Sequence, residues 1–447
     1  MSNLSDLLPA GASAKSITAT DSGSGITSGK PVILETAGTV TQIAETTVSA
    51  SIPEGSESTW YPQPASPPYT SASYMDIAFD SNSNKFVITY ADGRNSSYFT
   101  YIVGEVNTGT GALTWGTRTV LNSFASSFMS VAFDPSTAGT LAVTYNVSGV
   151  FYVRVGTLSG TTLRFGTVAS ITSGNEYGQV AFDFTSGAFV VSYADPAGSP
   201  ANSLYAIAGT YVGTTITLGS SVQLYNLAIA AEYVAIAFDP NTSGKFTTVT
   251  NASAAPYQGL AVCGTLSGTT ITEGTAQNYI ATKATYPGVV YDSLTANRLI
   301  ICFKDDDNSL YGAAYAATLS GTVFTFGTKL QFNSTASTDM WPMAPAGVGG
   351  KFEVVYRNAD TAQRPFTVAL SLSGTTVTGG TPVQITTYGV NDRDYLTAAM
   401  NPNDAGSFVT SWRDRDYDAC IAVTSQAGWV ATNLTTSNFL GIADEAI

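Results

Sequence analysis

The sequence predicts an all-β protein made of repeated four-stranded antiparallel units. Three observations predict it: a short glycine-containing phrase that recurs six times, an apolar phrase ending in Asp that recurs upstream of it, and apolar residues that alternate with a period of two. Charged residues make up only 11% of the chain, while Gly, Tyr and Phe are frequent, which is typical of β-structure with many turns.

The first phrase has the form "LSGTTITEGT" and predicts a tight hairpin. Its Gly supplies the positive φ that a two-residue turn requires, and the flanking Thr, Leu and Val favour strands. The six copies occupy residues 108–117, 158–167, 211–220, 266–275, 319–328 and 372–381. The chain therefore contains one such hairpin in each of six successive repeats.

The second phrase ends in an aromatic residue followed by Asp and predicts the first strand of each repeat. Its five clear copies end in Phe79-Asp80, Phe133-Asp134, Phe182-Asp183, Phe238-Asp239 and Tyr291-Asp292. Two degenerate copies, at 341–345 and 397–402, place Met343 and Met400 at the aromatic position. Successive copies lie 49 to 57 residues apart, so the chain contains seven repeats. We expect each Asp to form a turn by accepting backbone N–H bonds.

Each repeat reads as four strands in chain order. The apolar phrase is followed by a turn, an alternating strand such as 188–193, a polar loop, a third strand such as 259–266, and the hairpin that leads to the fourth strand. A lone sheet cannot bury both faces, and about 50 residues with four strands per repeat is typical of a β-propeller. We predict a seven-bladed β-propeller over 74–424. An elongated β-solenoid is the alternative, but its repeats are shorter.

The two ends of the chain are predicted to serve attachment. Residues 1–50 are expected to form an N-terminal β arm, in which the hairpin-like stretch 30–46 either attaches the protein or supplies the outer strand that the seventh repeat lacks. Residues 51–73 contain five prolines and predict an extended spacer. Residues 425–447 are expected to form a C-terminal tail for docking or oligomerisation.

Composition argues against several classes of function. The net charge is −14 with 18 Lys and Arg in total, which argues against a nucleic-acid partner. No apolar run approaches the roughly 20 residues of a membrane helix, and the first residues lack the features of a secretory signal, so we expect no membrane insertion and no export. Cys263, Cys302 and Cys420 lack metal-ligand spacing and are expected to be buried free thiols.

Catalytic chemistry has little support in the sequence. The chain contains no histidine, which removes the commonest general base and transition-metal ligand. It also lacks the GxxxxGK loop that binds nucleotide phosphates. We therefore expect a protein that is not an enzyme and that uses no cofactor.

Acidic clusters recur after the second strand of several repeats, so they are expected to share one rim. The candidate binding residues come from two of these clusters: Asp305, Asp306, Asp307, Asp414, Asp416 and Asp418. Such residues are also ordinary turn formers. Two alternatives remain: either triplet offers oxygen ligands for Ca²⁺, although without EF-hand spacing, and a pair of acids would serve a glycan-depolymerising enzyme.

Tyrosines stand just before the first strand in three successive repeats. They are Tyr177, Tyr233 and Tyr286. Such rings either pack between neighbouring blades or stack on sugar rings at the rim, and packing is the favoured interpretation.

The combined pattern of "VAFDP", an alternating strand, an acidic loop and "VGTLSGTTxxFGT" resembles repeats in structural proteins of tailed, notably marine, bacteriophages. The resemblance covers about 74–424, and segments 1–16, 28–46 and 432–447 are similar to parts of phage fibre-like proteins. It implies a virion protein of the tail-fibre, appendage or decoration type, assembled in the host cytoplasm. Its implied partners are other virion proteins and a host-surface glycan or receptor, with a homotrimer as the implied assembly. A bacterial surface adhesin or lectin is the alternative.

Overall fold

The structure is a computed structural model of the chain. It describes residues 31–34, 40–42, 52–53, 55–62, 72–173, 178–195, 203–226, 231–252, 258–344, 347–359, 363–390, 396–404, 406–414, 420–428 and 439–442. The chain forms two compact units, one from Met1–Thr47 with Val430–Ile447 and the other from Val48–Trp429.

Three short strands are described in the smaller unit. They are β1 (Pro31–Leu34), β2 (Val40–Gln42) and β37 (Phe439–Ile442). β1 pairs antiparallel with both β2 and β37, so this sheet joins segments from the two ends of the chain. The hairpin-like stretch 30–46 therefore pairs with a C-terminal strand.

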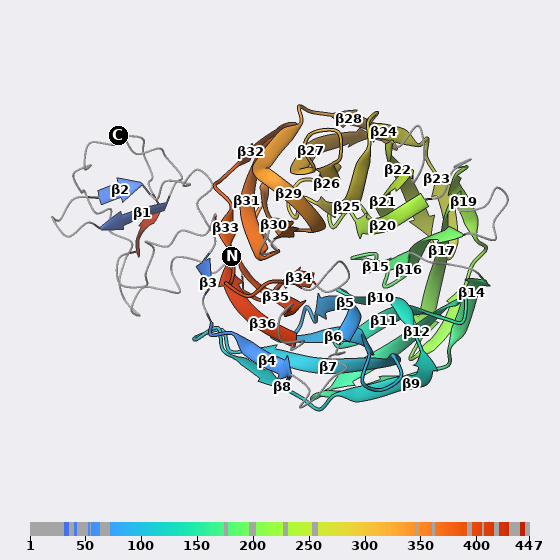
Figure 1. Cartoon of the computed structure of the whole chain (residues 1–447). Coiled ribbons are helices and arrows are strands. Elements are labelled where there is room, and N and C mark those ends of the chain that lie inside the picture. The colour runs from blue at the N-terminus through green and yellow to red at the C-terminus, as the bar shows by residue number, and fades with distance from the viewer. Residues whose placement is uncertain are drawn as a thin grey trace, which may run out of the picture. The chain divides into compact units, whose positions relative to one another are not determined.

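The larger unit is all-β, which confirms the predicted class. Its described residues contain strands and no helix, so none of them forms an apolar helix long enough to cross a membrane. Hydrogen bonding joins the strands into five sheets of five strands and one sheet of nine, and the predicted four-stranded antiparallel path recurs in them. Figure 1 shows these sheets arranged around a common centre, with the first strand of each repeat nearest to it.

The strands of the repeats are as follows. The first strands are β5 (Ala72–Phe79), β10 (Ser127–Phe133), β15 (Gly178–Phe182), β20 (Ala231–Phe238), β25 (Ala284–Tyr291), β29 (Leu330–Met343) and β34 (Leu396–Met400). The second strands are β6 (Lys85–Asp92), β11 (Thr140–Val147), β16 (Phe189–Asp195), β21 (Lys245–Ala252), β26 (Arg298–Asp305), β30 (Lys351–Asn358) and β35 (Ser407–Arg413). The third strands are β7 (Tyr98–Val106), β12 (Val150–Ser159), β17 (Ser203–Val212), β22 (Gly259–Ser267), β27 (Tyr311–Ser320), β31 (Pro365–Ser373) and β36 (Cys420–Gln426).

The outer edge of a repeat carries two short strands in line instead of one fourth strand. The hairpin pieces are β8 (Leu113–Trp115), β13 (Thr162–Phe165), β18 (Thr215–Leu218), β23 (Thr270–Glu273), β28 (Val323–Phe326) and β32 (Thr376–Gly379). The second pieces are β9 (Thr119–Ala125), β14 (Ala169–Ser173), β19 (Val222–Tyr225), β24 (Gln277–Ile280) and β33 (Val383–Gln384). β23 and β24, for example, both pair with β22.

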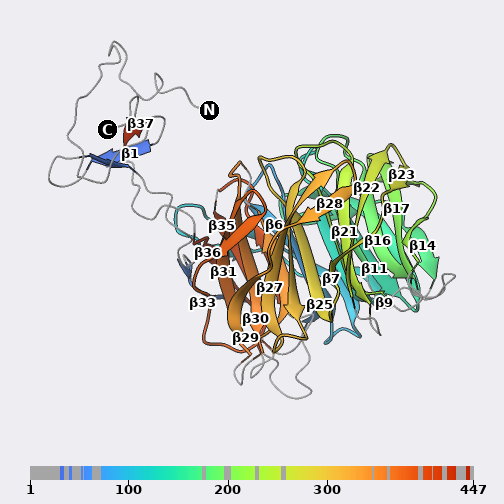
Figure 2. The same cartoon turned by 90° about the horizontal axis from the view of Figure 1, so that it is seen from above.

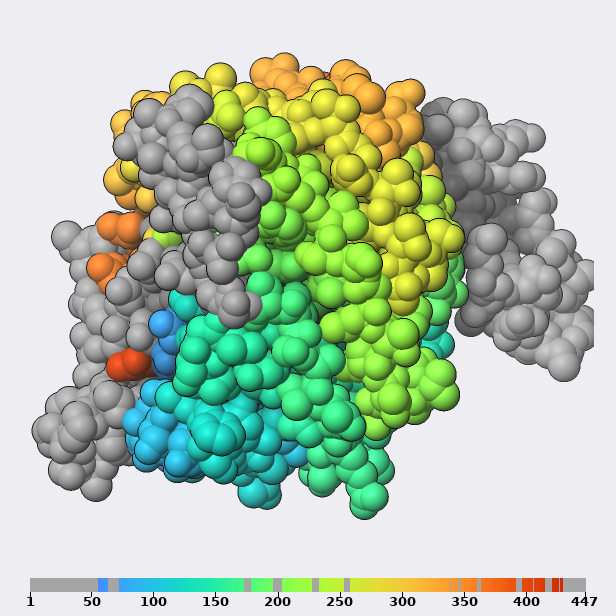
Figure 3. Space-filling model, turned by 90° about the vertical axis from the view of Figure 1, so that its right-hand side faces the viewer, coloured from blue at the N-terminus to red at the C-terminus, as the bar shows by residue number. Residues whose placement is uncertain are grey.

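The break between the two pieces falls at the second Gly of the hairpin phrase, and the neighbouring repeat explains it. A Cβ on Gly219 would lie 2.1 Å from the Thr269 carbonyl oxygen, and one on Gly327 would lie 1.9 Å from that of Thr375. These Thr residues belong to the hairpin of the next repeat. The phrase therefore has two functions, because its first Gly makes the turn and its second lets the next hairpin approach. Figure 3 shows consecutive stretches of the chain lying side by side on one face of the molecule.

The nine-stranded sheet arises because one strand belongs to two repeats. β29 is 14 residues long. Its beginning pairs with β27 as an outer piece, and its end pairs with β30 as a first strand. A register shift between Thr338 and Trp341 places Ala344, not Met343, in the position that Phe79 occupies in the first repeat. The prediction that Met343 takes the aromatic position of this repeat is therefore wrong by one residue.

Strands from the N-terminal side complete the last sheet. β3 (Ile52–Pro53) and β4 (Ser58–Tyr61) both pair antiparallel with β36. The prediction of a spacer over 51–73 is therefore wrong for these strands, and the outer partner of β36 is not the stretch 30–46. β4 supplies hydrogen-bond partners for backbone groups of β36 that would otherwise have none. Its aromatic residues, Trp60 and Tyr61, are buried.

The apolar core lies between neighbouring sheets. One cluster joins Val190 and Leu204 of one sheet to Phe238, Phe246 and Leu260 of the next, and similar clusters recur between other sheets. Burial thus occurs face to face, as alternation in the strands predicts. Figure 2 shows this stacking from another side, with the strands of successive sheets lying next to one another.

The Asp that follows the first strand accepts hydrogen bonds within its own turn, as expected, and also accepts one from the next repeat. Asp183 accepts hydrogen bonds from Ser186 N–H (3.1 Å) and from Gly244 N–H (3.0 Å) of the next repeat. Burial acts to raise the pKa of Asp183, but these hydrogen bonds lower it overall. The same bond between repeats joins Asp80 to Gly139, Asp239 to Asn297 and Asp292 to Gly350.

Candidate functional site

One position in the first strand has an unusual backbone in repeat after repeat. The residues there have a positive φ, between 50° and 54°, and they are Tyr74, Phe128, Tyr233, Tyr286 and Asp339. We call these five residues the bulge cluster, because the strand register shifts at each of them. The corresponding residues of the third and seventh repeats, Tyr177 and Tyr395, lie outside the described residues.

The conformation of the bulge cluster is unfavourable for aromatic residues. A left-handed backbone brings Cβ close to the carbonyl oxygen and destabilises a residue other than Gly by about 1–2 kcal/mol. A β-bulge also redirects the side chain away from the regular strand pattern. Such strain persists where the surrounding structure imposes it, and it concentrates at binding sites. Its repetition in four aromatic residues marks this position as the candidate site.

The bulge cluster lines a cavity of about 290 Å³ between the first strands. Its four aromatic side chains are half-buried. They pack in pairs, with ring centroids 4.9 Å apart for Tyr74 and Phe128 and 4.4 Å apart for Tyr233 and Tyr286. Trp341 also lines the cavity. A concave, largely apolar wall with several aromatic residues and a few polar groups is typical of a small-ligand site.

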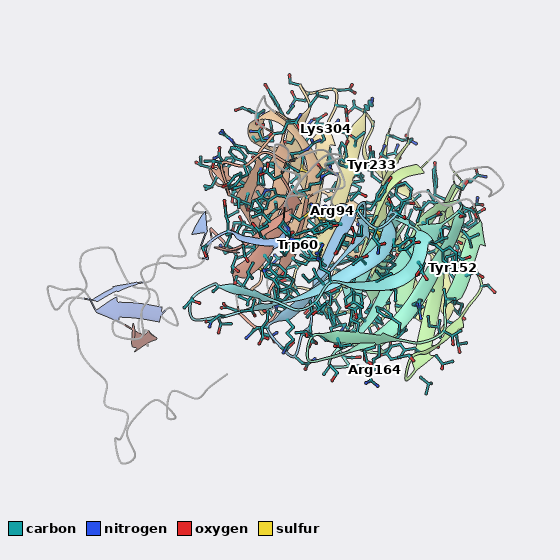
Figure 4. The ribbon with its side chains drawn as sticks, turned by 60° about the horizontal axis from the view of Figure 1, so that its bottom comes forward. Trp60, Arg94, Tyr152, Arg164, Tyr233 and Lys304 are labelled. Atoms are coloured by element: carbon teal, nitrogen blue, oxygen red, sulfur yellow. The ribbon has the colours of Figure 1, made fainter. Side chains whose placement is uncertain are left out.

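Charged groups lie on one side of this wall. Asp339 Oδ2 is 3.1 Å from Arg357 Nε, and both side chains are nearly buried. Lys304 Nζ lies 5.1 Å from the Tyr286 ring centroid and 3.1 Å from Asp306 Oδ1. Tyr233 and Lys304 are labelled in Figure 4. The site therefore combines aromatic faces with fixed charges.

Asp76 follows the bulge in β5 and is fully buried. Its carboxylate accepts hydrogen bonds from Ile77 N–H and from Val131 N–H of the next repeat, both at 2.9 Å. Burial raises the pKa of Asp76 to about 7, although the hydrogen bond from Val131 acts in the opposite direction.

The first candidate triplet is held in structural interactions. Asp305 is buried and pairs with Lys329 Nζ at 2.5 Å, and Asp306 accepts a hydrogen bond from Thr285 Oγ1 at 2.6 Å. Asp307 accepts the backbone N–H of Lys283 at 3.0 Å. The three carboxylates therefore interact with different partners and do not converge on one point.

The second candidate triplet is only partly described. Asp414 is buried and forms an isolated bridge with Val390. Asp416 and Asp418 lie outside the described residues. Within the part of the chain that the structure describes, no three acidic or Cys side chains are grouped so that they could hold a metal ion.

The cysteine prediction is confirmed, since Cys263, Cys302 and Cys420 are buried and form no disulfide. Burial raises the pKa of the Cys263 thiol to about 11. Cys263 is therefore a protonated part of the core.

A second cavity, of about 510 Å³, lies where the first strands end. Its wall contains Phe133, Phe182 and Phe238 together with small apolar residues such as Ala132 and Ala237. These aromatic residues belong to the recurring "AFD" phrase and have regular strand backbone, with no positive φ. The aromatic residues of this second cavity therefore lack the strained backbone found in the first cavity.

Sequence reasoning found part of the bulge cluster. It singled out Tyr233 and Tyr286, and their rings do pack against each other across two repeats. It missed Tyr74, Phe128 and Asp339. The available signal was a residue five positions before the end of each first-strand phrase, which is aromatic in most repeats.

Comparison with solved structures shows the fold. The chain is similar to the BP39L lectin from Burkholderia pseudomallei, with a TM-score of 0.58 and 10% identity over 85% of this chain and 100% of the lectin. It also matches a protein from Lactobacillus plantarum (TM-score 0.48, 12% identity, 81% and 98% covered) and a functionally unknown protein from Desulfotomaculum acetoxidans (0.49, 9%, 84% and 96%). No protein-family model and no curated protein matches the chain. The similarity to the lectin establishes an all-β fold of repeated four-stranded sheets.

Proposed function

We propose that the repeats are the blades of one closed seven-bladed β-propeller. In support, the first strands contact one another in the order β5, β10, β15, β20, β25, β29 and β34, and β34 contacts β5. On this proposal the nine-stranded sheet is two blades joined through β29, and the five other sheets are one blade each.

Contacts between the last and first repeats support closure. Asn401 occupies the position that Asp80 occupies in the first repeat, and its Nδ2 donates to Asn84 Oδ1 at 3.5 Å. A Cβ on Gly55 would lie 2.4 Å from the Gly111 carbonyl oxygen, the same approach that Gly219 makes to Thr269. The last repeat thus meets the first as the others meet their neighbours.

We propose that this propeller is a non-enzymatic carbohydrate-binding module. The observation that carries the proposal is the bulge cluster, where strained aromatic side chains form the wall of a cavity. Aromatic faces stack on the C–H faces of sugar rings, and an ion pair beside them can bond hydroxyl groups. A bacterial lectin with a similar fold supports the same function.

A glycan array with binding constants from calorimetry tests this function. We expect wild-type protein to bind a defined set of glycans, and Tyr233→Ala with Tyr286→Ala to weaken binding about tenfold or more, because two stacking surfaces are lost. Phe124→Ala is the matched control, since Phe124 is 66% exposed and is not part of the cavity wall. Absence of glycan binding, or equal loss in the control, contradicts the proposal.

The glycan-depolymerising alternative is not favoured, because Asp305, Asp306 and Asp307 already stabilise neighbouring groups. We expect no release of reducing ends from any polysaccharide that the protein binds. Turnover that disappears in Asp306→Asn, with binding retained, would overturn the non-enzymatic proposal.

We further propose that the module belongs to a phage virion appendage or fibre, where it contacts other virion proteins and a host-surface glycan, as a homotrimer. This step is supported by the sequence resemblance of the repeats and of both ends of the chain. Mass spectrometry of purified particles should detect the chain, and light scattering of the purified protein should give three times the mass of one chain. A protein found only on bacterial cells would favour the adhesin alternative.

A further inference from the structure

The bulge cluster is not uniform, and its exception is a carboxylate. Asp339 has a φ of 54°, within a few degrees of the four aromatic members. The backbone therefore presents an acid where other repeats present a ring. Asp tolerates the left-handed region better than aromatic residues do, so this position is both less strained and chemically different.

Asp339 is held in a fixed orientation. Its Oδ2 lies 3.1 Å from Arg357 Nε, with both side chains only 7% exposed, and Arg357 Nη1 donates to Gln363 Oε1 at 3.4 Å. An ion pair in such surroundings restricts the rotation of the acid.

Asp339 also lines the same cavity as the aromatic wall. The lining includes Tyr233, Tyr286 and Trp341 as well as Asp339, so a ring stacked on the aromatic faces has a carboxylate at its edge. Two neighbouring hydroxyl groups of a sugar can both donate to one carboxylate. The negative charge of Asp339 would instead repel the carboxylate of an acidic sugar.

We propose that Asp339, oriented by Arg357, determines specificity by accepting hydrogen bonds from two adjacent hydroxyls of a neutral sugar stacked on the aromatic wall. The inference rests on the proposed carbohydrate-binding function and names its ligand class. Uronic and sialic acids are excluded from the site.

The test uses the full chain and calorimetric titration with methyl glycosides of mannose, galactose and glucose, their monodeoxy derivatives, glucuronic acid and sialic acid. We expect a neutral glycoside to bind and the acids not to bind. Asp339→Asn should weaken the neutral glycoside about tenfold to a hundredfold, because a hydrogen bond to a charged group is lost. Asp307→Asn is the matched control outside the cavity.

A cycle of deoxy sugars separates direct recognition from a structural effect. Removing either bonded hydroxyl should weaken binding to wild type, and this loss should be largely absent in Asp339→Asn. A full deoxy effect in Asp339→Asn, or preferential binding of the acidic sugars, overturns the inference. If the Tyr233→Ala and Tyr286→Ala variant loses glycan binding while Asp339→Asn does not, the inference fails and the carbohydrate-binding function stands. If wild type binds no glycan, the function itself fails.

Discussion

Tyr286 illustrates how a single backbone angle limits which side chain a position accepts. Its φ is 52°, so Ala at this position keeps the strain, whereas Gly adopts the left-handed region freely. We predict that Tyr286→Gly is more stable than Tyr286→Ala by about 1 kcal/mol, because both variants lose the ring and only Ala keeps the unfavourable angle. Chemical denaturation of the two variants measures the difference.

Val289, three residues later in β25, is the control for this comparison. It is buried and has no positive φ. There Val289→Ala should be more stable than Val289→Gly, the usual order within a strand. The same order at both positions would show that the bulge imposes no strain.

Asp76 gives the stability of the protein a distinctive dependence on pH. Its pKa rises from 3.8 to about 7 on folding, so the folded chain keeps a proton that the unfolded chain releases. This contribution is complete below about pH 4 and is lost as the pH rises to about 7. Because the chain has no histidine, few other groups titrate in the upper part of that interval, above about pH 5.5.

We therefore predict that the melting temperature falls between pH 5 and pH 7, and that Asp76→Asn removes most of this slope. Thermal melts in buffers of equal ionic strength measure it. Burial also raises the pKa of Asp404, so Asp404→Asn is the comparison variant. If the slope is unchanged in Asp76→Asn and abolished in Asp404→Asn, then Asp404 and not Asp76 causes the pH dependence, and the prediction is wrong.

The residue scale is also where sequence reasoning reached its limit at the site. Tyr233 and Tyr286 could be singled out because the amino-acid sequence shows aromatic residues at equivalent positions of successive repeats. Asp339 could not, because nothing in a degenerate copy fixes its register. The acidic triplets drew attention by charge density, yet Asp305 and Asp306 are occupied by Lys329, Lys304 and Thr285.

Contact between neighbouring hairpins depends on the second Gly of the recurring phrase. A Cβ on Gly219 would overlap the Thr269 carbonyl, which is backbone and cannot rotate away. We predict that Gly219→Ala destabilises the protein by about 1–3 kcal/mol through overpacking. Gly268, the turn Gly of the next hairpin, has no atom near such a Cβ but has a φ of 59°.

The variant Gly268→Ala should therefore lose only about 1 kcal/mol, the strain of a left-handed Ala. Urea denaturation of the two variants, read by intrinsic fluorescence, compares them. If both variants lose the same free energy of unfolding, the close approach of neighbouring hairpins at Gly219 imposes no cost on a Cβ, and the prediction is wrong.

Strands and their order within a repeat could be predicted because they depend on local alternation and turn residues. The hairpin, the first strand and the Asp turn all follow from short phrases such as 266–275. The split outer strand could not be predicted, since it results from the approach of the next repeat. Nor could the pairing of β4 with β36, because a proline-containing segment has no local signal for a partner more than 350 residues away.

At the scale of the whole molecule, the pairing of β4 with β36 joins distant parts of the chain. Tyr61 and Cys420 are opposite one another in this pairing. We predict that Tyr61→Cys forms a disulfide with Cys420, because antiparallel partners bring Cα atoms within the required range. The oxidised variant should be more stable than its reduced form by about 2–4 kcal/mol.

Thermal melts with and without reducing agent measure this gain, and the melting temperature of wild type should not depend on reductant because its cysteines form no disulfide. Comparing one variant with itself removes the effect of losing the tyrosine ring. A variant that stays reduced under oxidising conditions would contradict the pairing.

The order in which a ribosome makes these strands has a consequence for folding. Tyr61 emerges first, but its partner Cys420 emerges only after 359 further residues, which is the difference of the two positions in the sequence. At about 5–20 residues per second, β4 waits roughly 20 to 70 seconds for this strand partner, although Tyr90 and Trp115, which contact Trp60, emerge much earlier. During that interval the nascent chain carries β4 without its strand partner, so chaperones would have most to do just before β36 is made.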